Sequence, residues 1–263
     1  MSFNPKFTVS TNMAKCLMDI ESLRQQIESA PFSVQLLQSL RESAKLATTH
    51  YSTQIEGNKL TLGEVQQVVK DNLSIPGKAR DQSEVLFHQL GINYVEELSK
   101  KTGKINASQI KILHGLIQTG KRRQSDYRDG QNVIRDSRTG GIVYMPPESQ
   151  DVPDLMQNLL TWVNTTVKAS ETPIVIIAAV AHYQYVTIHP YYDGNGRTAR
   201  LITNLILKKY GYGLKGLFSL EEFYVDNLEG YYSSLSVGPS HNYYLGRAEA
   251  DISQFLEYFC NGM

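Results

Sequence analysis

The stretch that decides the fold is HPYYDGNGRTAR, at residues 189–200. It brings an imidazole, a carboxylate, a Gly-Asn-Gly turn and two guanidinium groups close together. Residues 174–188 before it are almost wholly apolar, and Thr172 and Pro173 predict the N-cap and the first position of a buried helix. Residues 197–209 after it carry leucine and isoleucine at helical spacing. The stretch is therefore predicted to be a loop that joins two core helices.

The turn at the start of the second helix predicts an anion site. Unpaired backbone N–H groups and the positive end of the helix dipole attract anions there, and Gly194-Asn195-Gly196 lets a phosphate approach the backbone closely. Arg197 and Arg200 are three residues apart, so both should point to one side of the first helical turn and hold further phosphate oxygens. Together they predict a cradle for more than one phosphate.

Two further side chains complete the candidate site. A lone carboxylate beside phosphates needs a cation between them, so Asp193 is a candidate ligand of Mg²⁺. His189 can accept a proton near neutral pH. Each feature also has an ordinary explanation, because aspartate and Gly-Asn-Gly are common in turns and surface arginines are usually solvated. Residues 189–200 taken together are much more specific than any one of these features.

This stretch resembles the signature of Fic-domain proteins, His-x-Phe-x-Asp/Glu-Gly-Asn-Gly-Arg-x-x-Arg, with Tyr191 where phenylalanine is usual. The resemblance implies a mainly α Fic fold, in which a helical bundle surrounds a buried helix-loop-helix motif and carries a small β-hairpin flap. It also implies a protein adenylyltransferase, which transfers AMP from ATP to a serine, threonine or tyrosine hydroxyl of a target protein. The implied roles are His189 as base, Asp193 as Mg²⁺ ligand, Asn195 with Gly194 and Gly196 at the α-phosphate, and Arg197 and Arg200 at the β- and γ-phosphates.

The composition favours a globular protein with ample material for a core. Of 263 residues 41% are hydrophobic, and 26 basic residues balance 26 acidic ones. Zero formal net charge argues against a general binder of nucleic acid or membrane surfaces. No apolar run reaches the length of a membrane span, and residues 1–15 lack a signal-peptide core. With Cys16 and Cys260 expected as free thiols, we expect a cytoplasmic protein.

Two helices are predicted in the first part of the chain, at residues 12–29 and about 34–57. The second ends in Ser52-Thr53-Gln54-Ile55-Glu56-Gly57. Glu56 there is either an ordinary solvated residue or a carboxylate with a binding partner, because the helix dipole mildly disfavours negative charge in the last turn. Ser52-x-x-x-Glu56-Gly57 is similar to the inhibitory-helix motif that precedes the core in one large class of Fic proteins. The resemblance implies that Glu56 pairs with Arg200 and leaves ATP in a non-productive pose.

One β signal is convincing. Residues 132–134 and 142–144 predict a hairpin with residues 135–141 as its turn. It is either a stabilising ribbon or the flap by which Fic proteins dock a target segment through strand addition. We favour the flap, with Ile142, Val143 and Tyr144 near the target.

The remaining patterns predict further helices. Their expected ranges are 62–72, opened by a Thr61/Glu64 capping box; 81–101; 106–117; 151–167; a helix capped by Ser219-x-x-Glu222 that continues past residue 230; and 241–259. Three histidines within these patterns and the core, His88, His114 and His182, are expected to be packed or exposed residues rather than metal ligands. The resemblance to a Tyr-Tyr-x-x-Leu element of Fic proteins implies that one or both of Tyr231 and Tyr232 line the adenine pocket. The alternative is one buried and one exposed ring.

The expected organisation is a single unit. Residues 1–105 form an N-terminal helical region with the inhibitory helix, 106–240 the Fic core and 241–263 a C-terminal helix. The expected partners are ATP and a protein substrate, without nucleic acid or membrane, and a homodimer is left open. Two rival functions stay open as well. One is AMP removal or another phosphate-ester transfer on the same scaffold, and the other is a non-catalytic regulator that binds ATP.

Overall fold

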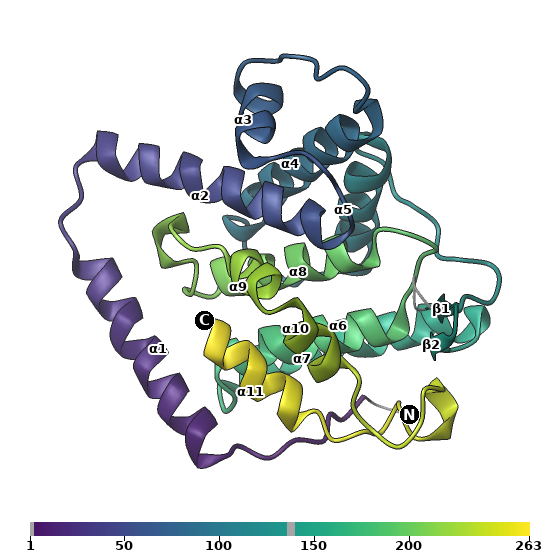
Figure 1. Cartoon of the computed structure of the whole chain (residues 1–263). Coiled ribbons are helices and arrows are strands. Elements are labelled where there is room, and N and C mark those ends of the chain that lie inside the picture. Colours follow the sequence, from purple (N-terminus) through teal and green to yellow (C-terminus); the bar gives the residue numbers. More distant parts are fainter. Residues whose placement is uncertain (1–2, 136–139) are drawn as a thin grey trace.

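The computed structural model describes residues 3–135 and 140–263 (Figure 1). Over these ranges it contains eleven α-helices and one two-stranded antiparallel sheet, which confirms the predicted mainly α fold. The elements are α1 Thr11–Ser29, α2 Val34–Ile55, α3 Leu62–Lys70, α4 Ala79–Ser99, α5 Ala107–Thr119, β1 Ile134–Arg135, β2 Ile142–Tyr144, α6 Val152–Ala169, α7 Ile174–Ile188, α8 Asn195–Lys209, α9 Leu220–Asp226, α10 Leu228–Leu235 and α11 Ser253–Gly262.

The pair α7 and α8 forms the centre of the molecule. Nearly every side chain of α7 is buried, as expected of a helix that is apolar on all sides. It packs against α8, and α4, α5, α6 and α11 surround the pair. The helix begins one residue later than predicted, because Pro173 is its N-cap and has extended backbone angles. Residues 189–194 connect the two central helices, as the sequence predicts.

The helix predicted at 34–57 is α2, which runs across α4, α8 and α9 (Figure 1). Ser33 caps its start, and Gly57, with a φ of +90°, follows its end. Helix α1 packs against α11, so the two ends of the chain meet. The thiol of Cys16 there donates a hydrogen bond to the backbone oxygen of Cys260 at 3.0 Å, and both thiols are free, as predicted.

Local capping signals set the starts of two further helices. Thr61 and Glu64 form the predicted capping box of α3, and Asn106 and Gln109 form a second one at α5. None of the helices in the described ranges has the length and apolar character needed to cross a membrane.

Two helix predictions in the last part of the chain are wrong. The helix expected over 241–259 begins only at Ser253, because residues 241–243 pair with Met145 through two backbone hydrogen bonds and Gly246 has a φ of +111°. The helix predicted after Ser219 is divided into α9 and α10. Asn227 ends the first helix, and its side chain accepts a hydrogen bond from the N–H of Gly230 at the start of the second.

The hairpin is present, with its second strand at the predicted residues 142–144 and a first strand that is shorter and shifted. Ile134 pairs with Tyr144 and Arg135 with Ile142, so the first strand begins two residues later than expected. Residues 136–139 of the predicted turn lie outside the described residues. Tyr144 is buried and its hydroxyl donates to the backbone oxygen of Thr187 on α7 at 2.7 Å, which fixes β2 beside the end of that helix.

Candidate active site

The loop after α7 begins with a residue in an unusual conformation. His189 ends α7 in the left-handed region, with φ 51° and ψ 60°, although it is not glycine. Such conformations persist only where the surroundings hold them, and they cluster at functional sites. The side chain of Asn195 supplies part of that hold, because it accepts from the N–H of Tyr191 at 3.0 Å and donates to its oxygen at 2.7 Å. These bonds occupy the Asn195 side chain, so its main chain is what remains for a phosphate.

Arg128 fixes the same loop from outside the motif. Its Nε donates to the backbone oxygen of His189 at 2.9 Å, and its own N–H donates to the oxygen of Pro190 at 3.0 Å. The buried guanidinium also donates to the backbone oxygens of Gly130 and Pro147, which flank the hairpin. One side chain therefore ties the histidine loop to both ends of the hairpin segment.

His114 on α5 is a positioning residue that the sequence did not distinguish from an ordinary packed histidine. Its ring stacks on Tyr191 with 3.5 Å between ring centroids and 5° between planes. Its Nε2 lies 2.9 Å from the backbone oxygen of Asp193. Burial lowers the pKa of His114 to about 4, so the ring is neutral and donates from Nε2 to that oxygen. No local pattern in α5 could have revealed this contact, because its partners lie almost eighty residues away.

The imidazole of His189 is set up to accept a proton. Its Nδ1 lies 3.3 Å from the backbone oxygen of Val186, which can only accept, so Nδ1 carries the hydrogen and Nε2 keeps its lone pair. The ring is half-buried, and burial lowers the pKa of His189 to about 4. The imidazole is therefore neutral at physiological pH.

The start of α8 has the features of an anion cradle. Gly194 is its N-cap with a φ of +76°, and the next N–H groups of the helix face outward from its first turn. Arg197 is buried, and its guanidinium lies 3.6 Å from the Asp193 carboxylate. Its Nε is buried without a hydrogen-bond partner among the described residues. An unsatisfied buried donor of this kind is costly unless an acceptor fills it, and a phosphate oxygen would do so.

The second arginine is bound to the end of α2. Arg200 is 2% exposed, and its Nε and Nη2 donate to the hydroxyl and the backbone oxygen of Ser52 at 2.9 and 2.8 Å. Nη2 also lies 2.8 Å from Oε1 of Glu56. Burial alone would lower the pKa of Arg200, but the Glu56 carboxylate raises it above its ordinary value. The predicted pairing of Glu56 with Arg200 is thus present in the structure.

Glu56 also occupies space in the cradle itself. A Cβ placed on Gly196 would lie 2.2 Å from Oε1 of Glu56 and 3.1 Å from Nη1 of Arg200. The carboxylate therefore lies against the first turn of α8, where the helix N-terminus attracts negative charge. A phosphate bound there would have to share this position with Glu56 or displace it.

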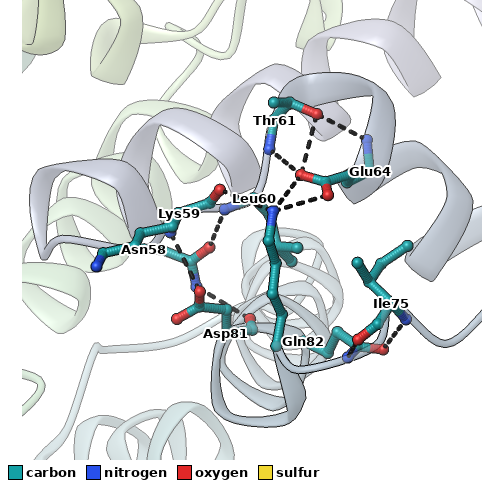
Figure 2. Close-up of polar contacts among 9 residues, drawn as sticks. Asn58, Lys59, Leu60, Thr61, Glu64, Ile75, Asp81 and Gln82 are labelled. Atoms are coloured by element: carbon teal, nitrogen blue, oxygen red, sulfur yellow. Dashed lines mark hydrogen bonds and ion pairs between the residues drawn. The ribbon is translucent and has the colours of Figure 1, made fainter.

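Hydrogen bonds anchor the chain after α2 to α4 (Figure 2). Because Glu56 directly precedes this segment, the anchor restrains its position. Asn58 is buried and donates to the backbone oxygen of Asp81 at 2.9 Å, while its own oxygen accepts from the N–H of Leu60. Lys78 pairs with Glu64 at 2.7 Å, next to the capping box that opens α3. The segment between α2 and α3 therefore has little freedom to move while these bonds remain.

Asp193 is suited to bind Mg²⁺ together with phosphates. Its side chain is 66% exposed, Oδ1 accepts from the N–H of Gly194 at 2.6 Å, and Oδ2 lies 3.6 Å from Nη2 of Arg197. No group of three histidine, cysteine or acidic side chains with metal-site geometry occurs in residues 3–135 and 140–263. Mg²⁺ commonly takes one or two carboxylates and completes its shell with phosphates and water, so one exposed carboxylate beside an anion cradle fits that ion.

The two tyrosines proposed for the base pocket separate in the structure. Tyr231 is 2% exposed, and its hydroxyl lies 2.9 Å from Nε2 of His182 in the core. His182 is thereby explained as a packed histidine, as predicted. One ring is therefore buried and the other exposed, which is the alternative arrangement that the sequence left open. Tyr232 is 49% exposed and stays a candidate for contact with a base.

The strand β2 presents its first two residues to solvent. Ile142 and Val143 are exposed, whereas Tyr144 is buried. The site thus brings together His189, Asp193, Gly194, Gly196, Arg197, Arg200, Ser52 and Glu56, with the hairpin attached through Arg128. Of the predicted set, the side chains of Tyr144 and Tyr231 are buried, and that of Tyr231 interacts with Arg200.

Comparison with known proteins agrees with this geometry. Residues 104–207 match the Fic/DOC family. The chain is 30% identical to protein adenylyltransferase fic-1 of Caenorhabditis elegans over 94% of this chain and 48% of that protein. It is also 30% identical to protein adenylyltransferase Fic of Drosophila persimilis over 78% of this chain and 39% of that protein. The chain thus spans about half or less of the length of these relatives.

Solved structures show the same architecture. A Fic family protein from Desulfovibrio desulfuricans superposes with a TM-score of 0.78 and 25% identity, covering 99% of this chain and 74% of that one. Residues 134–508 of Fic-1 from C. elegans superpose with a TM-score of 0.72 and 25% identity, covering 94% and 68%. Sequence, fold and site geometry agree, and residues 104–207 of this chain therefore form a domain of the Fic/DOC family.

Proposed function

We propose that this protein is an adenylyltransferase that transfers AMP from ATP to a hydroxyl group of a target protein and releases pyrophosphate. The observation that carries the proposal is the neutral imidazole of His189 beside a helix N-terminus with two buried arginines. The names of the relatives from C. elegans and Drosophila support the same reaction.

His189 is the proposed base. With hydrogen on Nδ1, Nε2 can take the proton of a serine, threonine or tyrosine hydroxyl as its oxygen attacks the α-phosphorus. The new oxygen–phosphorus bond forms while the bond from the α-phosphorus to the bridging oxygen breaks, and pyrophosphate leaves with that oxygen. A positioned base of this kind contributes about 10²–10⁴-fold to the rate.

The start of α8 holds the triphosphate in this proposal. Backbone N–H groups at Gly196 and its neighbours bind phosphate oxygens, Arg197 supplies its unsatisfied Nε, and Arg200 binds the terminal phosphates once it is free. Phosphoryl transfer depends mainly on positioning and charge stabilisation, which these donors provide. Asp193 would hold Mg²⁺, which would neutralise phosphate charge when bound.

Glu56 restrains the activity in this proposal. While its carboxylate pairs with Arg200 and lies against Gly196, the terminal phosphates lack one of their two arginines and part of the cradle. ATP bound in that state presents its α-phosphate in a non-productive orientation. A signal that withdraws the end of α2 from α8 would free Arg200 and the part of the cradle that Glu56 occupies.

The hairpin is the proposed docking site for the target segment. Ile142 and Val143 are exposed, and Arg128 links the hairpin to the backbone of the base. A target strand that pairs with β2 would therefore be placed relative to His189.

The free thiols Cys16 and Cys260 suit a reducing compartment, so we place the reaction in the cytoplasm.

Intact-mass spectrometry tests the reaction. We expect Glu56→Gly protein incubated with Mg·ATP to gain the mass of one or more AMP groups through self-modification, and Glu56→Gly, His189→Ala protein to gain none. Transfer of AMP to an added protein substrate by the Glu56→Gly protein, but not by the double variant, would support the proposal equally.

The other outcomes separate the rival functions. A gain of phosphate mass would replace AMP transfer with kinase chemistry. Release of AMP from a modified protein, dependent on Glu56, would favour AMP removal. Nucleotide binding without any transfer, to the protein itself or to proteins of a cell extract, would favour a regulator and refute the proposal.

A further inference from the structure

A cavity of about 440 Å³ lies on α8 away from the cradle. It is bounded by α2, α4, α8, the end of α1 and the loop at residues 211–218. Its apolar part is formed by Ile92, Val95, Leu201 and Leu214, all of them buried. Cavities of about 300–1,000 Å³ with an apolar lining and a few convergent polar groups commonly bind small ligands.

The charged part of the lining is strongly basic. The cations are Arg41, Lys45, Lys100, Lys208 and Lys215, whereas the only acids are Glu28 and Glu96. Lys45 and Lys208 share one carboxylate, that of Glu96, at 2.9 and 3.8 Å. Within residues 3–135 and 140–263, the other three lining cations form no ion pair. The cavity therefore has an excess of positive charge that its own acids do not balance.

The excess positive charge of the cavity includes Lys208, which is partly buried. Its side chain is 27% exposed, and burial together with nearby Lys45 and Arg41 lowers its pKa against the opposing effect of Glu96. A partly buried ammonium group beside other cations is unfavourable without a nearby anion. An anionic ligand in the cavity would supply the missing negative charge.

The backbone of residues 211–216 lines the cavity and holds Arg41 beside it. Gly211 and Gly216 have φ values of +89° and +78°, which favour glycine. Nε of Arg41 donates to the backbone oxygen of Lys215 at 2.5 Å, so this arginine is held at the rim of the cavity. Its other guanidinium nitrogens have no hydrogen bond or ion pair within residues 3–135 and 140–263, so they can bind phosphate in the fork geometry that arginine favours.

We propose that this cavity is a second ligand site, distinct from the motif, which binds a small phosphorylated molecule with an apolar ring, such as a nucleotide. The ring packs on Ile92, Val95 and Leu201, and the phosphates meet Arg41, Lys100 and Lys208. The proposal goes beyond AMP transfer and does not depend on it, because the motif at residues 189–200 supplies none of its cations.

Isothermal titration calorimetry with ADP tests the proposal. The variant is Arg41→Gln, Lys100→Gln, which removes two exposed cations of the cavity. The matched control is Lys15→Gln, Lys168→Gln, which removes two exposed cations elsewhere. Each removed charged contact weakens a phosphate complex measurably, so we expect the cavity variant to lose one class of ADP site or bind there at least about tenfold more weakly. The control should bind as wild type does.

The interpretation does not depend on one variant. Lys208→Met should weaken the same class of site, and thermal unfolding shows whether each variant remains folded. ADP bound at the motif alone would be unaffected by either cavity variant. Equal ADP binding by wild type, cavity variant and control, or no ADP binding by wild type, overturns the proposal.

Discussion

The contact between Glu56 and Arg200 leads to a quantitative prediction for release of inhibition. Replacing Glu56 with glycine removes the carboxylate that lies 2.8 Å from Nη2 of Arg200 and against Gly196. Arg200 keeps its two bonds to Ser52, so the helix should stay in place while the guanidinium gains freedom to bind phosphate. Replacing Glu56 with glutamine keeps an acceptor at the same place but removes the charge.

The size of the effect follows from the burial of the two partners. A hydrogen bond to a charged group contributes about 1.5–3 kcal/mol. Arg200 is buried, but the Glu56 side chain is 32% exposed and partly screened by solvent, so the lower end of that range applies. About 1.4 kcal/mol corresponds to a tenfold change in population. We expect about tenfold faster AMP incorporation for Glu56→Gly and a smaller rise for Glu56→Gln.

The assay is the initial rate of AMP incorporation from labelled ATP, measured on the protein itself at equal concentrations. Gln54→Gly is the matched control, because it places glycine in the same last turn of α2 at an exposed side chain. A rate for Glu56→Gly no higher than that of wild type or of Gln54→Gly would refute the reasoning. A greater rate for Glu56→Gln than for Glu56→Gly would also contradict it.

Three further predictions concern the base, the loop and the anchor of α2. Because burial lowers the pKa of His189 to about 4, activity should fall with decreasing pH only near pH 4, and a pH profile of kcat/KM that falls near pH 6.5 would contradict the neutral base. The hydroxyl of Tyr191 is buried without a partner among the described residues, so Tyr191→Phe should leave stability unchanged or raise it by about 1–2 kcal/mol in denaturant unfolding; a clear loss would reveal a missed partner. Asn58→Ala leaves the oxygen of Asp81 and the N–H of Leu60 without this partner, so the free energy of unfolding should fall by about 1–2 kcal/mol. The rate of self-modification should rise, because the end of α2 is held less firmly. A lower melting temperature with an unchanged rate would show that this anchor does not act on Glu56.

Much of the local structure was predictable because its causes lie within a few residues. The capping boxes at Thr61 and Asn106 begin α3 and α5, and the apolar run before His189 forms the buried helix α7. The twelve-residue motif carries its helix start, both arginines and the base in one segment. These features depend on backbone hydrogen bonds and side-chain spacing that neighbouring residues specify.

Predictions failed where distant segments compete for the same backbone. Residues 241–243 pair with Met145 instead of continuing a helix. Tyr231 has the sequence context of a pocket residue, yet its hydroxyl bonds to His182 and its ring is buried. Each outcome depends on a partner that no local pattern identifies.

The sequence by itself determined the helical class, the order of most helices and the residues of the candidate site. Tertiary structure alone decided that Glu56 lies against Gly196, that His114 and Arg128 hold the loop, and that α2, α4 and α8 enclose a basic cavity. The physical reason is the separation along the chain between the residues that interact. Capping and periodicity act over one or two helical turns, whereas burial and pairing between segments about sixty to one hundred and fifty residues apart depend on how the whole chain packs.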